Sequence, residues 1–191
     1  MLVDNHAGVR EHGLMLAEKY PKMLPQIIEM MNDSVPRVSF QAILSLGNSK
    51  NSMATGALRR VLNKSVENQW YRMAVLSGEN GYSKSLIDSL KTHSAFFNEK
   101  DDDRSKFIYG LAYSQGGHNL DPEIAGTLSV LGDSTLANQQ FWFTAYLDGL
   151  SDGRKSNPEV GKLGAQTLLK LKSNSASVNT ESKQVIEELL K

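Results

Sequence analysis

Histidine and carboxylate side chains are the groups in this chain that could bind a metal ion. Two histidines that share a helix face stand three or four residues apart, and none of the four histidines has this spacing. The acidic run DDD at 101–103 could hold magnesium or calcium, because both ions prefer carboxylate oxygens. At a helix start, the same run would interact favourably with the helix dipole. We therefore expect no metal site: the acidic run would interact with the helix dipole, and the histidines would have polar or capping roles. The four histidines are His6, His12, His93 and His118.

Two carboxylates, Asp148 and Asp152, have a spacing that could support acid–base catalysis, because they lie four residues apart on one predicted helix. Glycine follows each of them, at 149 and 153, and we interpret the repeated Asp-Gly pair as a helix end. The glycines at 116–117 follow a predicted helix and not a strand, which argues against a phosphate-binding loop. We predict no catalytic and no cofactor-binding residue in this chain.

The densest basic cluster consists of Arg59, Arg60 and Lys64. Arg60 and Lys64 stand four residues apart on a predicted helix, so they face the same way. An anionic partner could dock on this face; the alternative is an ordinary solvated helix surface. These three residues are the predicted partner-binding surface.

Composition narrows the classes of function. The chain has 191 residues, with 21 Lys and Arg against 21 Asp and Glu. A domain that binds phosphate backbones usually carries a basic excess, so we expect no nucleic-acid partner. No cysteine is present, which excludes disulfides, thiolate zinc sites, iron–sulfur clusters and c-type haem attachment within the chain.

The sequence also bears on membranes and export. No apolar run approaches the roughly 20 residues that a membrane-spanning helix requires, so we expect no membrane span. The first six residues have neither the basic nor the apolar region of a signal peptide. They lead directly into a predicted helix, and we expect the chain to be a piece of a longer protein.

The elements that position these residues repeat along the chain. Three segments with small and aliphatic residues at helical spacing begin at Val9, Val38 and Tyr71, which places them 29 and 33 residues apart. A period between about 20 and 50 residues is typical of a solenoid of stacked repeats. We predict an all-α fold class, an α–α superhelix of about five antiparallel helical pairs. It would form a single domain over 1–191, regular over 1–92 and more divergent over 93–191.

Turn and cap signals divide the chain into helices. Gly47-Asn48 and Asn80-Gly81 predict helix ends, whereas Asp121-Pro122 and Asn157-Pro158 predict helix starts. The predicted helices span 6–19, 23–32, 36–47, 52–63, 69–79, 83–92, 101–117, a segment from 121 onward, 139–150, 157–172 and 180–191. Apolar spacing predicts a core that includes Leu14, Ile43, Leu46, Val75, Leu76 and the aromatic stripe Trp142, Phe143 and Tyr146.

Four stretches of the chain share a recognisable pattern. They are GVREH at 8–12 with 14–18, RV at 37–38 with FQ at 40–41 and LSLG at 44–47, Trp70 with Arg72 and AVLS at 74–77, and LDGLSDG at 147–153. These segments resemble HEAT repeats, and more narrowly the HEAT region of large exported bacterial dehydrogenase-like proteins with a c-type haem-binding domain. The resemblance covers about residues 6–153. Two residues depart from the family pattern: Tyr71 stands where it has valine, and Ser39 where it has arginine.

In that family, the helical array connects a propeller resembling sugar dehydrogenases to a cytochrome domain with a Cys-x-x-Cys-His site. This chain contains neither, so the resemblance implies a non-catalytic scaffold, a protein-interaction and spacer module without a cofactor of its own. Its partners would be neighbouring domains or another protein, and its location periplasmic or otherwise exported. The second helix of each pair, here with Arg59, Arg60 and Lys64, would line the concave binding side.

Two other functions stay open at the level of sequence. A HEAT-like nucleic-acid-binding protein, similar to some DNA glycosylases, would need a strongly basic concave groove. An enzyme built on helical repeats would need a deep pocket with converging ionisable groups.

Overall fold

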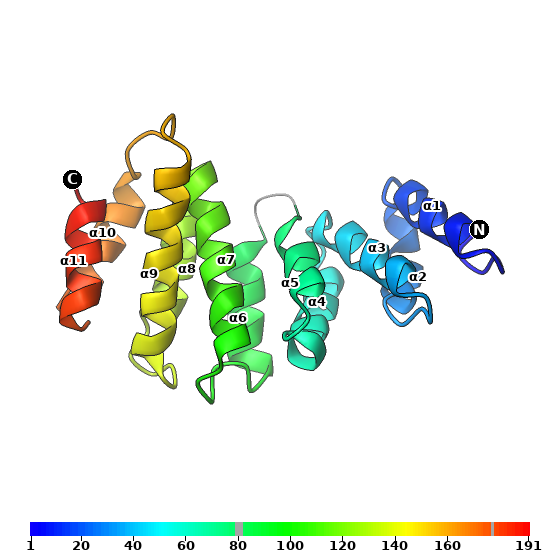
Figure 1. The fold of residues 1–191 in the computed structure, drawn as a ribbon, viewed down its shortest axis with the longest axis horizontal. Helices are drawn as coiled ribbons and strands as arrows, with labels where there is room; N and C mark the ends of the chain where they lie inside the picture. The colour runs from blue at the N-terminus through cyan, green and yellow to red at the C-terminus, as the bar shows by residue number, and fades with distance from the viewer. Residues whose placement is uncertain (79–81, 177) are drawn as a thin grey trace. The chain divides into compact units, whose positions relative to one another are not determined.

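All regular secondary structure in the described chain is helical, as predicted. The computed structural model describes residues 1–78, 82–176 and 178–191, and within these ranges it contains no β-strand. The α-helices and one 3-10 helix, η1, are labelled in chain order (Figure 1). They are α1 Ala7–Ala17, η1 Pro21–Met23, α2 Leu24–Met30, α3 Pro36–Gly47, α4 Ser52–Ser65, α5 Gln69–Leu76, α6 Ser83–His93, α7 Asp102–His118, α8 Asp121–Leu131, α9 Gln139–Ser156, α10 Ala165–Asn174 and α11 Thr180–Leu189.

Side-chain caps explain where several helices begin. The Asn51 side chain accepts a hydrogen bond from the Met53 amide at 2.8 Å and starts α4, and Asn68 starts α5 in the same way. Asp101 accepts from the Arg104 amide at 2.8 Å and starts α7. These bonds satisfy amides that the first turn leaves unpaired. The acidic run at 101–103 opens a helix as predicted, with Asp101 as the cap of α7 and Asp102 and Asp103 in its first turn. The predicted turn at Asn80-Gly81 lies outside the described residues.

The described chain divides into two compact units, Met1–Tyr82 with α1 to α5 and Ser83–Lys191 with α6 to α11. In the first unit α3 is central, because it packs against α1, α2, α4 and α5. Four of the predicted core residues in this unit, Leu14, Ile43, Leu46 and Val75, are buried, whereas Leu76 is half-buried. In the second unit α7 packs on α9, α8 on α6 and α10, and α11 on α9.

Glycines allow α7 and α9 to approach each other closely. A β-carbon on Gly149 would collide with the carbonyl oxygen of Tyr109, and one on Gly153 with that of Tyr113. A β-carbon on Gly116 would lie 2.5 Å from the Leu150 carbonyl oxygen. The contacts follow the same order along both helices, because Tyr109 meets Gly149 and Tyr113 meets Gly153. α7 and α9 therefore run parallel, side by side (Figure 1).

This contact corrects the predicted end of the helix at 150. The Asp-Gly pairs at 148–149 and 152–153 lie inside α9, which continues to Ser156. Glycine is unfavourable in a helix interior by about 1 kcal/mol, so sequence alone favoured a helix end. In the structure, these glycines have no side chain, and this allows the two helix backbones to touch.

The predicted helix start at Asn157-Pro158 is wrong. Residues 157–164 are not helical, and α10 begins at Ala165. The Asn157 side-chain amide donates to the Gly117 carbonyl at 2.9 Å and so is used elsewhere. The start of α10 is capped from another helix, because the Asp121 carboxylate accepts hydrogen bonds from the Gln166 and Thr167 amides at 3.1 and 2.8 Å.

The aromatic stripe of α9 is core, as predicted: Trp142, Phe143 and Tyr146 are fully buried. The Tyr146 hydroxyl donates to the Gln115 side-chain oxygen at 2.5 Å. The Gln115 amide in turn donates to the Thr127 hydroxyl at 3.1 Å. This buried chain of hydrogen bonds joins α9, α7 and α8.

We expect Tyr146→Phe to lower the free energy of unfolding by about 1–3 kcal/mol, because it leaves the buried Gln115 oxygen without a donor. Urea unfolding followed by circular dichroism measures the change. Tyr113→Phe is the matched control, since Tyr113 lies on the same unit with its side chain exposed. Equal stability of the two variants would contradict a structural role for the buried chain.

Candidate functional site

The predicted basic cluster lies on α4, and the structure brings two of its three members into one groove. Arg60 and Lys64 are exposed and line a groove of about 630 Å³ in the Met1–Tyr82 unit. Arg59 is half-buried and is not part of the lining. The prediction that Arg60 and Lys64 face the same way is therefore confirmed, and Arg59 does not share their position.

The groove is formed by α2, the turn after it, α3, α4 and the first turn of α5. Its lining mixes apolar and polar side chains, and its other charged side chains, Glu29 and Asp33, are acidic and belong to α2 and the turn after it. Two cations from α4 and two carboxylates from the region of α2 therefore line the same groove. Its apolar lining residues are Ile28, Met31, Ile43 and Val61.

Tyr71 and Ser39, the two departures from the HEAT pattern, meet inside this groove. Their hydroxyl oxygens lie 3.0 Å apart, and the Ser39 hydroxyl also donates to the Pro36 carbonyl at 2.9 Å. Ser39 is 2% exposed, so the pair connects α3 to α5 beneath the groove surface. Tyr71 is larger than the valine of the repeat pattern and Ser39 is smaller than its arginine, so the two departures compensate for each other in size.

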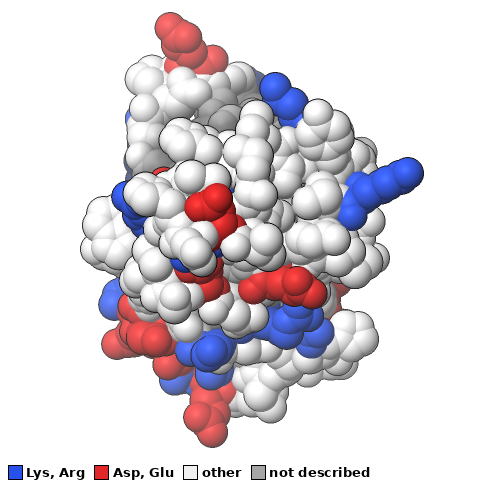
Figure 2. Space-filling view, turned by 90° about the vertical axis from the view of Figure 1, so that its right-hand side faces the viewer, with Lys and Arg blue, Asp and Glu red and all other residues white. Residues whose placement is uncertain are grey.

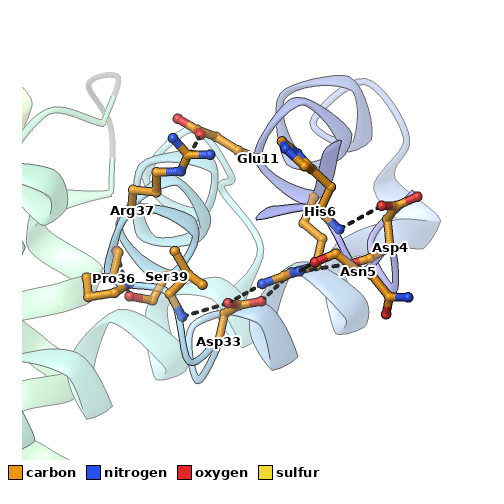
Figure 3. Close-up of polar contacts among 10 residues, drawn as sticks. Asp4, Asn5, His6, Glu11, Asp33, Pro36, Arg37 and Ser39 are labelled. Atoms are coloured by element: carbon orange, nitrogen blue, oxygen red, sulfur yellow. Dashed lines mark hydrogen bonds and ion pairs between the residues drawn. The ribbon is translucent and has the colours of Figure 1, made fainter. Parts of the chain in front are cut away.

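An arginine–carboxylate pair holds Asp33, which lines the groove, in place; Figure 3 shows the polar contacts around the Asp33 carboxylate. Arg10 Nε and Nη2 donate to the two Asp33 oxygens at 2.8 and 2.9 Å, and the Val35 amide donates to the same carboxylate at 2.9 Å. Arg10 Nη1 also donates to the Asp4 carbonyl at 2.8 Å. The hydrogen bonds from Arg10, opposed by burial, lower the pKa of Asp33. Bidentate pairing of this kind fixes both groups in one geometry.

We expect Asp33→Asn to flatten the acid dependence of stability. The folded-state pKa lies below the ordinary value of 3.8, so the ionised carboxylate stabilises the fold above that value. This contribution is lost as the pH falls through the lowered pKa. Urea unfolding midpoints across the acid range should converge for the parent and Asp33→Asn as the pH falls. Glu67→Gln, which removes an exposed carboxyl of the same unit, is the control for the loss of one negative charge. Parallel curves for the parent and Asp33→Asn would contradict the pairing.

The three arginines near the starts of α1, α3 and α5 have different partners. Arg10 pairs with Asp33, whereas Arg37 reaches Glu11 at 3.3 Å, as Figure 3 shows. Arg72 donates to the Val66 carbonyl at 2.5 Å. These side chains tie neighbouring segments together individually and form no uniform ladder.

The other polar groups singled out in the sequence contact protein groups within the Ser83–Lys191 unit. Nδ1 of His118 lies 2.9 Å from the Ser114 carbonyl oxygen. Asp152 accepts a hydrogen bond from the Tyr109 hydroxyl at 2.9 Å. Burial, followed by the nearby carboxylates of Glu181 and Asp152, raises the pKa of Asp148. Within the described ranges, no three histidine or carboxylate side chains cluster in a way that could hold a metal ion.

Charge is mixed on the face that Figure 2 shows, which views the molecule from the side of α1 and α2. Basic and acidic side chains lie among one another there, most densely over the lower half. None of the helices in the described ranges combines the length and the apolar character needed to cross a membrane.

Comparison with known proteins identifies no relative: no family model, no curated protein and no solved structure matches the chain.

Sequence reasoning found the cations of the groove and missed its carboxylates. Asp33 lies three residues after the end of α2, and Arg10 stands 23 residues earlier in α1. An arginine near the start of one helix and an aspartate in the turn after the next is the signal that could have predicted their pairing. Nothing in the local sequence around Glu29 points to the groove.

Proposed function

We propose that this chain is a non-catalytic helical-repeat scaffold that binds another protein through the groove bounded by Arg60 and Lys64. Each unit would be a stretch of an α-solenoid, in which antiparallel helical pairs stack side by side. Such arrays present extended surfaces to partners, because each pair buries its apolar face against its neighbours.

Contacts between alternate helices support the stacked arrangement. In the first unit α1 packs on α3 and α3 on α5, while α2 contacts α4. In the second unit α7 packs on α9, and α8 on α10. In a closed bundle, by contrast, the helices pack around one centre, and nothing requires each helix to contact the next but one along the chain.

The lining of the groove supports a protein partner. Apolar side chains such as Ile28 contribute to it, and Arg60 and Lys64 share its lining with Glu29. A nucleic-acid backbone carries a phosphate at every step and would bring negative charge to Glu29 as well as to the cations. An extended peptide segment can place an acidic side chain beside Arg60 and Lys64 and an aliphatic one beside Ile28. This juxtaposition is the single observation that carries the proposal.

The wider context of the proposal follows from the resemblance to HEAT regions of exported dehydrogenase-like proteins. In that setting the module would connect neighbouring domains outside the cytoplasm, and any redox cofactor would lie in those domains.

Selection of phage-displayed random peptides on the full chain tests the proposed groove. Recovered peptides should combine Asp or Glu with Leu, Ile or Val, and the double change Arg60→Glu and Lys64→Glu should weaken them at least about tenfold. The matched control is Lys19→Glu with Lys22→Glu, the same change of charge on exposed residues of the same unit outside this groove. Equal binding to both double variants, or no enrichment, would overturn the proposal.

A further inference from the structure

A second pocket, in the Ser83–Lys191 unit, is lined by both cationic and aliphatic side chains. It encloses about 390 Å³, within the range of small-molecule sites. The end of α9, the connection before α10, α10 itself and the end of α11 all contribute to it. We refer to it as the C-terminal pocket; its lining is Ser151, Arg154, Lys155, Lys162, Leu163, Leu168, Glu188, Leu189, Leu190 and Lys191.

Arg154 brings a positive charge into the wall of this pocket. Its guanidinium donates to the Asn119 side-chain oxygen at 2.7 Å and to the Gly161 carbonyl at 2.8 Å. Both acceptors are neutral, and they use two of the five N–H donors of the group. Burial lowers the pKa of Arg154, with no opposing contribution from a carboxylate. The fold therefore holds a partly desolvated cation whose hydrogen-bond partners do not neutralise it.

The remaining charges leave the pocket positive. Four of its lining side chains are cationic and one, Glu188, is anionic. Glu188 lies 4.0 Å from Lys155, which also lies 3.8 Å from Asp152. Lys155 thus has two carboxylates close by, whereas Arg154 and Lys162 are the cations toward which an anion would be drawn.

The aliphatic part of the lining sets the second requirement on a ligand. Leu163 is 6% exposed, and Leu168, Leu189 and Leu190 are half-buried around the same space. Leucines and cations in one pocket complement a molecule with one anionic group and a short aliphatic chain. A simple inorganic anion would leave the leucine surface in water, and a neutral alkane would leave the cations unpaired.

We propose that the C-terminal pocket binds a small amphiphilic anion, an aliphatic carboxylate whose headgroup pairs with Arg154 and Lys162 and whose chain lies on the leucines. This site is separate from the groove on the other unit, and its existence does not depend on the function proposed above.

Titration of the full chain with sodium octanoate, 1-octanol and sodium acetate tests the proposal. Calorimetry should give saturable binding of octanoate at one site, with octanol and acetate each at least about tenfold weaker, because each lacks one of the two contacts. Methyl signals of Leu163, Leu168 and Leu189 should shift on addition of octanoate. No saturable binding, equal binding of octanol and octanoate, or shifts confined to other residues would overturn the proposal.

Variants separate the roles of the two cations. Arg154→Gln should weaken octanoate about tenfold, since a charge-assisted hydrogen bond in a partly buried site is lost. Lys162→Gln changes an exposed residue, does not threaten the fold and should weaken octanoate about threefold. The control Lys183→Gln removes an exposed lysine of α11 outside the pocket and should change nothing. Equal affinities for the parent, Lys162→Gln and Arg154→Gln would contradict the assignment.

Discussion

We expect Gly153→Ala to lower the free energy of unfolding of the Ser83–Lys191 unit by about 3 kcal/mol, at the upper part of the usual range for overpacking. The added β-carbon would collide with the Tyr113 carbonyl oxygen, which belongs to the backbone of α7 and cannot turn away. The direction of this change distinguishes crowding from helix propensity. Alanine is the better helix former by about 1 kcal/mol, so it would raise the free energy of unfolding at an uncrowded site. Urea unfolding followed by circular dichroism measures the effect.

Two control variants isolate close helix contact as the cause. Gly56→Ala lies inside α4, where a β-carbon would meet nothing within 4 Å, and should stabilise the protein by about 0.5–1 kcal/mol. Gly161→Ala, outside any helix and equally uncrowded, should change stability by less than about 0.5 kcal/mol. If Gly153→Ala behaved like Gly56→Ala, the close approach of α7 and α9 would be refuted.

Trp142→Ala should destabilise the same unit by about 3–5 kcal/mol, the usual cost of removing a large buried aromatic side chain. The indole is fully buried and lies 5.4 and 6.1 Å, centroid to centroid, from the rings of Phe97 and Phe96. Its N–H donates to the carbonyls of Phe97 and Ala137 at 3.3 and 3.1 Å, so the segment before α7 loses an anchor as well.

The other tryptophan of the chain supplies the control. Trp70 is 58% exposed on α5, and Trp70→Ala should cost less than about 1 kcal/mol. Thermal and urea unfolding by circular dichroism avoid any dependence on tryptophan fluorescence. Similar midpoints for the two variants would show that Trp142 does not occupy the core position described above.

Local sequence signals predicted most of the helices but failed where a distant residue decides the outcome. Asn51, Asn68 and Asp101 cap the helices that follow them directly, so their effect can be recognised from short segments. The start of α10 depends on Asp121, more than 40 residues away, and no local pattern reveals it. Gly149 suggests a helix end when only the local sequence is considered. Its role depends on the backbone of α7, which lies too close for a β-carbon at this position.

The candidate groove was likewise predictable only where the geometry of a single helix decides the outcome. The spacing of Arg60 and Lys64 predicts that they share a helix face, because only the geometry of one helix is needed. That they share a groove with Glu29 depends on how α2 lies against α3 and α4. The contact between Ser39 and Tyr71 likewise joins residues 32 apart, and each of them alone was only a departure from a repeat pattern.

Stacking of helical pairs is the claim on which the proposed scaffold depends, and proton–proton nuclear Overhauser contacts test it most directly. We expect contacts between the α-protons of Gly149 and Tyr109, of Gly153 and Tyr113, and of Gly47 and Gly78, since alternate helices would run parallel at glycine contacts in both units. The reversed order, Gly149 with Tyr113 and Gly153 with Tyr109, or the absence of all three contacts in a fully assigned spectrum, would contradict the stacked arrangement.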